Sequence, residues 1–331
     1  MPNKKRTIFT KILIWRYKYI SERQFILVLS VLVGFLAGLG TVLLKYLTLF
    51  IQSVLEGGFI RNYYYSLYFI FPIVGVWLVY LIKKNFLKKE IGHGISTTLY
   101  AISKRSGIIE RYKMFASLMV APITVGFGGS VGLQGPAVST GAAIGSNVAS
   151  MFHMNAKTRM LLIGCATAGA MSSMFKAPVA AIVFAVEIFS LDLVFTSLVP
   201  LLLASVAAVI TSYFFRGTDV LFSFELLDAW RVKDIVFYVF LGVATGIASV
   251  YFSKMYFLIT RFFAWFSNAY VKIGIAALAI GLMLYLFPPL YGEGYGLINN
   301  LLNGETEAAL NGIQYQIDFN NVWIVIAILL I

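Results

Sequence analysis

Long uncharged runs, separated by short clusters of charged residues, dominate the hydrophobic pattern of this chain. A bilayer core about 30 Å thick is crossed by about 20 helical residues, so runs near that length predict membrane-spanning helices. The predicted spans are 25–44, 63–82, 193–215, 235–252 (continuing as a long, tilted helix towards Arg261) and 273–290. A last apolar run, 322–331, has only ten residues and is too short to cross.

The longest uncharged run, Met114 to Phe152, is too long for one ordinary span and contains the Gly-rich stretch Gly126–Pro136. The pattern therefore predicts a break in the helix there. Non-helical backbone at membrane depth is tolerated only where protein buries it or where it lines a polar cavity. A helix that restarts at this break points its unpaired N–H groups and the positive end of its dipole into the cavity. We therefore expect an anion site, with the small residues of 137–146 packing closely against other helices.

Two further breaks follow the same logic. Gly92-His93-Gly94-Ile95-Ser96 predicts a second short helix running to about Ile102, capped by Ser96 or Thr97. Lys176-Ala177-Pro178 predicts the restart of another helix, because proline inside an apolar region favours a broken pair of helices over one rod.

Composition places the chain in the membrane. It has 331 residues, of which 60% are hydrophobic and 12% charged, with a mean hydropathy of +0.86. No soluble globular class has this composition, so the fold class is an all-α polytopic membrane protein.

Positive charge sets the expected orientation. Seven of the first 23 residues are Lys or Arg, which predicts a cytoplasmic N-terminus at the plasma (inner) membrane. Within this tail, residues 8–20 read as an amphipathic helix at the inner interface. The net charge is +12, but no nucleic-acid-binding motif accompanies the basic residues, so the bilayer is the expected partner and nucleic acid is not.

The chain is poor in residues for catalysis or metal binding. Its histidines are His93 and His153, and Cys165 is its single cysteine, which excludes an internal disulfide. It has no His-Glu-x-x-His motif and no nucleophile elbow. We therefore expect neither an enzyme nor a cofactor or metal, and Cys165 is expected only to pack.

Four segments, in their order along the chain, resemble signatures of the CLC family of chloride channels and chloride/proton exchangers. Gly92–Ser96 resembles the family's Gly-Ser-Gly-Ile-Pro, and Gly132-Leu133-Gln134-Gly135-Pro136 resembles its Gly-Lys/Arg-Glu-Gly-Pro. Lys176–Ala180 is similar to Asn-Ala-Pro-Leu-Ala, and Gly292–Ile298 is similar to a Gly-rich loop of the second repeat. The ordered set is far more specific than any one Gly-rich motif, and it covers the chain from about residue 25 onward.

The resemblance implies a fold of two inverted repeats, in which broken helices aim their N-termini at anion sites near the midplane. The expected organisation is a basic N-terminal segment at 1–23, a first repeat at 24–215 and part of a second repeat at 216–331. The family's Gly-x-Phe-x-Pro signature and pore tyrosine would lie beyond Ile331, so the second repeat is incomplete in this chain. A homodimer with one pore per subunit is also implied.

Departures from the family pattern bear on mechanism. Gln134 stands where the family has a gate glutamate, and it cannot titrate. Ile188 stands at the inner proton-accepting glutamate, directly after Glu187, which is either a replacement carboxylate or an interfacial ion-pair partner. His93 replaces an anion-binding serine and could add positive charge in acid, or serve only a structural role. Ser96 replaces a proline, and Leu133 replaces a basic residue that draws anions to the outer mouth.

The sequence thus predicts an anion channel or uncoupled transporter for chloride, with fluoride or nitrate as alternatives. A proton-coupled exchanger is the second hypothesis, and a non-conducting scaffold or truncated relic is the third. The expected anion-binding residues come from the two Gly-rich breaks: Gly92, His93, Gly94, Ile95 and Ser96 from the first, and Gly132, Leu133, Gln134, Gly135, Pro136 and Ala137 from the second.

Overall fold

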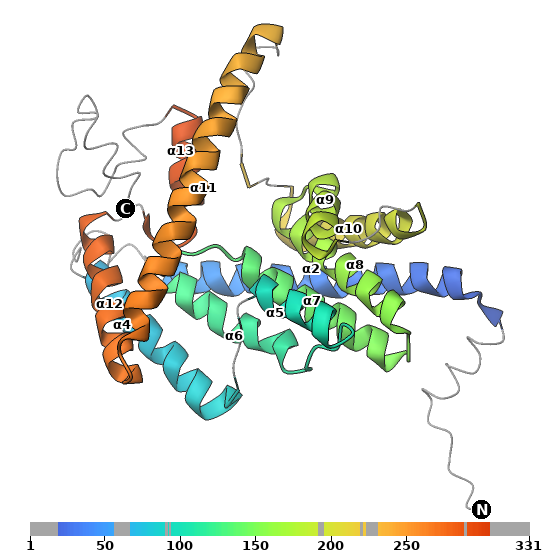
Figure 1. Cartoon of the computed structure of the whole chain (residues 1–331), viewed down its shortest axis with the longest axis horizontal. Coiled ribbons are helices and arrows are strands. Elements are labelled where there is room, and N and C mark those ends of the chain that lie inside the picture. The colour runs from blue at the N-terminus through green and yellow to red at the C-terminus, as the bar shows by residue number, and fades with distance from the viewer. Residues whose placement is uncertain are drawn as a thin grey trace, which may run out of the picture.

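The computed structural model describes residues 19–55, 67–89, 92, 94–190, 195–218, 221–222, 231–287 and 290–304. In those residues the regular structure is helical (Figure 1). The helices are α2 (Glu22–Leu55), α4 (Leu67–Ile82) with the π-turn η1 (Lys83–Leu87), α5 (Gly94–Lys104), α6 (Lys113–Gly126), α7 (Gln134–Met151), α8 (Ala156–Phe175), α9 (Pro178–Phe189), α10 (Phe195–Arg216), the 3-10 turn η2 (Val232–Asp234), α11 (Ile235–Ala264), α12 (Ala269–Leu286) and α13 (Tyr295–Leu302).

Five helices in the described part of the chain are long and apolar enough to cross a membrane, and they coincide with the predicted spans. They are α2, α4 with η1, α10, η2 with α11, and α12. Two predicted ends are wrong. The first span does not end at Leu44, because α2 continues through Lys45 to Leu55. The last does not reach Leu290, because α12 stops at Leu286, just before Pro288, in keeping with the bias against helix before a proline.

The predicted breaks are confirmed. The helix α6 ends at Gly126 and α7 begins at Gln134, so the long uncharged run is two helices with non-helical backbone between them. The helix α9 begins with Pro178 as its first residue, a position where the missing N–H costs nothing. The predicted capping of α5 is wrong: that helix begins at Gly94, which places Ser96 and Thr97 inside its first turn.

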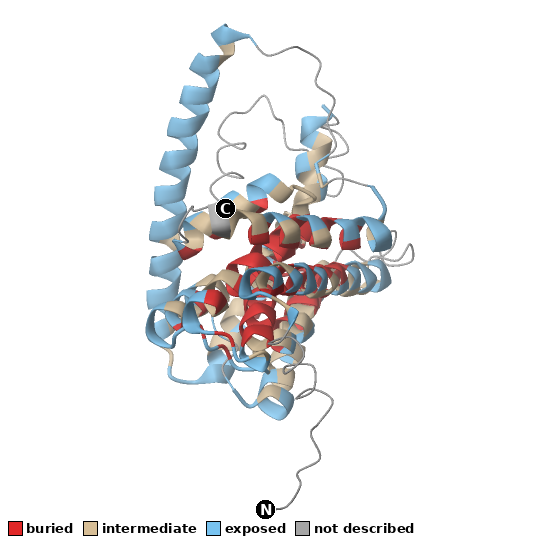
Figure 2. Ribbon diagram, turned by 90° about the vertical axis from the view of Figure 1, so that its right-hand side faces the viewer, coloured by how far each residue is buried: buried red, intermediate tan, exposed pale blue. Residues whose placement is uncertain are grey.

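Small residues let the central helices pack with their backbones in near contact. A Cβ atom on Gly34 of α2 would lie 2.2 Å from the carbonyl oxygen of Ala204 in α10. A Cβ on Gly141 of α7 would lie 2.8 Å from the carbonyl oxygen of Ala166 in α8, as expected for the small residues of 137–146. These approaches put the buried residues at the crossing of α2, α7, α8 and α10 (Figure 2), where Cys165 packs with its Sγ 3.7 Å from Ser30 Oγ.

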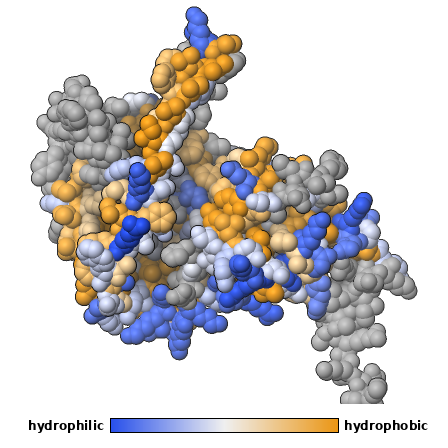
Figure 3. All heavy atoms as spheres, viewed as in Figure 1, coloured by the Kyte–Doolittle hydropathy of each residue, from blue (hydrophilic) through white to orange (hydrophobic). Residues whose placement is uncertain are grey.

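The long helix α11 extends away from this core (Figure 1). None of its 30 residues is buried. Its surface is largely apolar in the space-filling view (Figure 3). A helix that is apolar all round is stable in a bilayer or among further helices, so α11 has the character of a membrane helix.

The packing at Gly34 predicts a stability difference. Gly34→Ala forces a methyl group into the backbone of α10, and we expect it to lower the free energy of unfolding by about 1–3 kcal/mol. Gly246→Ala is the matched control, because nothing lies within 4 Å of a Cβ at that position on α11. Thermal unfolding of the detergent-solubilised protein measures both. Equal melting temperatures for the two variants would contradict the packing described here.

Candidate anion site

The two Gly-rich breaks lie against each other. Gly94, the first residue of α5, has φ +44°, and a Cβ atom there would lie 3.1 Å from the carbonyl oxygen of Gly135. Gly135 is the second residue of α7. The fold therefore brings the N-terminal ends of α5 and α7 into backbone contact, and a side chain at position 94 would separate them.

The first turn of α7 has no side-chain cap. Leu133 occupies the N-cap position with its side chain fully buried and makes no capping bond. The first backbone bond of this turn runs from Ala137 N–H to Leu133 O at 3.0 Å, and Pro136 has no N–H to offer. The N–H groups of Gln134 and Gly135 precede that bond and belong to the donors that a helix start leaves for another acceptor.

The segment after α12 packs onto this break. The Tyr291 hydroxyl donates a hydrogen bond to the carbonyl oxygen of Gly126, at the end of α6. A Cβ on Gly128, whose φ is +93°, would lie 2.7 Å from the Tyr291 ring. The Gly-rich loop of the predicted second repeat is thus a direct partner of the break in the first.

Two more residues of this segment reach the start of α7. Leu133 N–H donates to Glu293 Oε1 at 3.3 Å, and Gln134 Nε2 donates to the Tyr295 hydroxyl at 2.6 Å. The Gln134 side chain is half-buried and held by the tyrosine. Glu293 lies in the loop between α12 and α13, outside the five candidate spans; burial raises the pKa of its carboxyl, while the Lys45 charge and the Leu133 N–H act in the opposite direction.

A buried ammonium group completes the cluster. Lys45 of α2 is only 4% exposed, its Nζ donates to Met174 O at 3.3 Å, and the same Nζ lies 6.0 Å from the centre of the Tyr295 ring. The charge of Arg216, at the end of α10, acts on both Lys45 and Glu293, and that of Lys176 acts on Lys45. Positive charge therefore outnumbers negative charge among the groups that act on Lys45 and Glu293.

Sequence reasoning missed Lys45, Glu293 and Tyr295. Lys45 was available as a signal, because a lysine with apolar residues on both sides is rare inside a membrane helix and calls for a functional or structural reason. The roles of Glu293 and Tyr295 depend on contacts between segments about 160 positions apart, and nothing local to either segment predicts them.

The remaining residues that the sequence singled out differ in exposure and in what they contact. His93 lies outside the described residues. Gly92 has φ +80°, and a Cβ there would clash with the Thr97 side chain, while Ser96 is exposed. Ile188 is half-buried and packs against a cluster of apolar residues, and Glu187 is exposed near the end of α9.

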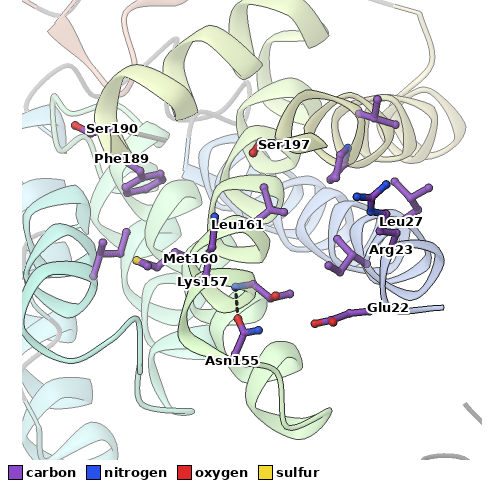
Figure 4. A pocket seen from close by; sticks show the side chains of 15 residues that line it. Glu22, Arg23, Leu27, Asn155, Lys157, Met160, Leu161, Phe189, Ser190 and Ser197 are labelled. Atoms are coloured by element: carbon purple, nitrogen blue, oxygen red, sulfur yellow. Dashed lines mark hydrogen bonds between the residues drawn. The ribbon is translucent and has the colours of Figure 1, made fainter. Parts of the chain in front are cut away.

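The end of α9 borders a separate cavity of about 620 Å³ (Figure 4). Its walls come from the starts of α2, α8 and α10 together with Ile102 of α5, Phe189 and Ser190. Asn155 caps α8 here by accepting from Thr158 N–H at 2.8 Å. Neither Glu187 nor any of the predicted anion-binding residues lines this cavity.

Known proteins resemble the chain over most of its length. Residues 74–331 match the family described as "Voltage gated chloride channel". The H(+)/Cl(-) exchange transporter ClcA of Vibrio cholerae is 26% identical in an alignment of 301 residues that covers 84% of this chain and 62% of the relative. A putative chloride channel protein, ClcB-like, from Ralstonia nicotianae is 26% identical over 70% of this chain and 55% of its own length. The chain thus spans about 62% of the length of the first of these curated relatives.

Solved structures show the same fold. A CLC-type fluoride/proton antiporter superposes with a TM-score of 0.69 at 24% identity, covering 92% of this chain and 74% of the other. A slow cyanobacterial Cl⁻/H⁺ antiporter gives 0.71 at 19% identity, covering 86% and 68%. With the broken helices, the apolar spans and the family match over more than half of its length, this chain belongs to the voltage gated chloride channel (CLC) family.

Proposed function

We propose that this chain moves a small inorganic anion across a membrane in exchange for protons, along a path that passes the start of α7. One observation carries the proposal: the N-terminal ends of α5 and α7 meet, and the N-cap residue Leu133 makes no side-chain capping bond to the first turn of α7. Each helix start presents N–H donors and the positive end of a dipole, so a shared start favours a negative ligand.

The chemistry of this site suits transport. Amides and helix dipoles hold a dehydrated anion without a direct ion pair, and a transport site must release what it binds. In the proposal the anion accepts from backbone N–H groups in the two breaks: Gly92, Gly94, Ile95 and Ser96 from the first, and Gly132, Leu133, Gln134 and Gly135 from the second. Pro136 shapes the turn, and the Ala137 N–H closes it on Leu133 O. Chloride is the proposed substrate and fluoride the alternative, in line with the ions named for similar proteins.

Proton coupling is supported by the relatives named as exchangers and antiporters. Uncoupled anion movement is the second candidate, because neither Gln134 nor Ile188 can carry a proton. Coupling in this chain therefore requires another acid. The homodimer, the plasma-membrane location with a cytoplasmic N-terminus, and the division at residues 23 and 215 remain predictions.

Flux measurements on the full-length protein in liposomes test the proposal. Under a chloride gradient we expect chloride efflux accompanied by proton movement in the opposite direction, with fluoride and nitrate as comparison anions. Chloride efflux without proton movement would favour the uncoupled candidate. No flux of any of these anions would overturn the transport function and favour a non-conducting scaffold.

A variant at Gly94 tests whether the anion binds where the starts of α5 and α7 meet. Gly94→Ala puts a methyl group against Gly135 at a positive φ, so we expect it to separate the starts of α5 and α7 and weaken chloride binding about tenfold, or about 1.4 kcal/mol. Gly274→Ala in α12 is the control, because a Cβ there meets nothing within 4 Å. Calorimetric chloride titration of both variants is the measurement. Unchanged affinity in Gly94→Ala would place the anion elsewhere.

A further inference from the structure

A carboxylate already occupies part of the proposed anion site. Glu293 Oε1 accepts from Leu133 N–H at 3.3 Å, at the N-cap position of α7. An anion bound to this helix start would need the same donor or its immediate neighbours. A carboxylate and a small anion are both negative and both accept from N–H groups, so they compete for this position.

We propose that the Glu293 side chain is the competitor of the transported anion at the start of α7, and that protonation of its carboxylate opens the site to the anion. The inference rests on the proposed function, since it assumes that an anion passes this helix start. It goes further by assigning the titratable role to a residue on the loop after α12, where neither Gln134 nor Ile188 can supply one.

The surrounding charges favour this exchange of one negative group for another. The groups that act on Glu293 or its neighbours are Lys45 from α2, Arg216 from the end of α10, Lys176 between α8 and α9, Tyr295 of α13 and Gln134 of α7. The three cations and one carboxylate sum to +2, and protonation of the carboxylate makes the sum +3. An anion that enters as Glu293 is protonated restores the sum to +2. Anion entry and proton uptake therefore support each other.

The loop geometry lets the carboxylate leave while its neighbours stay. Tyr291 holds Gly126 on one side of Glu293, and Tyr295 holds Gln134 on the other. Gly292 and Gly294, which flank Glu293, both have φ +72°. The anchoring contacts belong to the tyrosines, so a change of rotamer at Glu293 alone frees the Leu133 N–H.

The sign of the pH dependence follows from burial. Burial raises the pKa of the Glu293 carboxyl, so the proton binds above the ordinary pH range of a glutamate. As pH falls through that range, the carboxyl becomes neutral and no longer competes for the Leu133 N–H. Chloride flux and chloride affinity should then rise.

The test compares Glu293→Gln with the wild-type full-length protein in liposomes, from neutral pH down to the ordinary carboxyl range. We expect wild-type chloride efflux to rise about tenfold across this range, because a unit charge is removed beside the anion. Glu293→Gln keeps the size of the side chain and cannot titrate, so its efflux should already be high at neutral pH and should stay flat. Proton movement driven by chloride should fall in the same variant.

Glu110→Gln is the matched control. Glu110 is an exposed carboxylate that pairs with Arg105 and Lys113 and makes no hydrogen bond to Leu133, so its variant should keep the wild-type pH profile. A wild-type profile in Glu293→Gln, or a wild-type efflux independent of pH, would overturn the role of Glu293 while leaving anion transport intact. Absence of efflux from the wild type at every pH would instead overturn the proposed function.

Calorimetry keeps the inference testable if Glu293→Gln does not reconstitute. Chloride titrations of the wild-type protein in detergent should show affinity rising as pH falls, with proton uptake on binding. Binding that takes up no protons and has the same affinity at each pH would overturn the competition.

Discussion

Backbone that leaves the helix inside a membrane protein must find its hydrogen bonds within the protein. The segment between α6 and α7 is where this constraint acts most strongly. Part of the requirement is met locally, by Gly129 N–H on Thr124 O at 2.8 Å and by Val131 N–H on Gly129 O at 2.9 Å. The loop after α12 supplies partners for two more groups, through the Tyr291 hydroxyl on Gly126 O and the Glu293 carboxylate on Leu133 N–H. A distant part of the chain therefore contributes to the stability of the break.

The same constraint explains the packing around it. A helix that begins in the interior must be held by its sides, and α7 is held by α8 at Gly141 and Gly145, where the backbones nearly touch. The helix α8 in turn packs on α2 and α10, with Gly169 close to Gly34. Contacts of this kind leave little room for adjustment. The position of the α7 start is thus fixed by small residues further along the helix, and this fixes the direction of its N–H groups.

The sequence predicts the features that depend on local chemistry. Apolar length predicts the spans, because bilayer thickness sets helix length. Glycine and proline predict the breaks at 126–136 and 176–178, because they act on the backbone where they stand. Lys45 shows the limit of this reasoning: a charge next to an apolar run was taken as the end of a helix, whereas the fold buries it against Met174 O. The roles of Glu293 and Tyr295 could not be predicted from the sequence, because their contacts form only when the loop after α12 packs against α7.

Two contacts at the α7 start, Gln134 with Tyr295 and Leu133 with Glu293, explain how the structure accommodates a glutamine at position 134. A glutamine has an amide N–H, so it donates to the Tyr295 hydroxyl, a role that a carboxylate could not fill. The glutamine is thereby turned towards α13, and the N–H of the preceding residue is left to Glu293. A carboxylate at both positions would place two negative charges at one helix start, which like-charge repulsion opposes. The neutral residue at 134 and the acid at 293 are therefore compatible with each other, and one acidic side chain at this helix start is enough to compete with a passing anion.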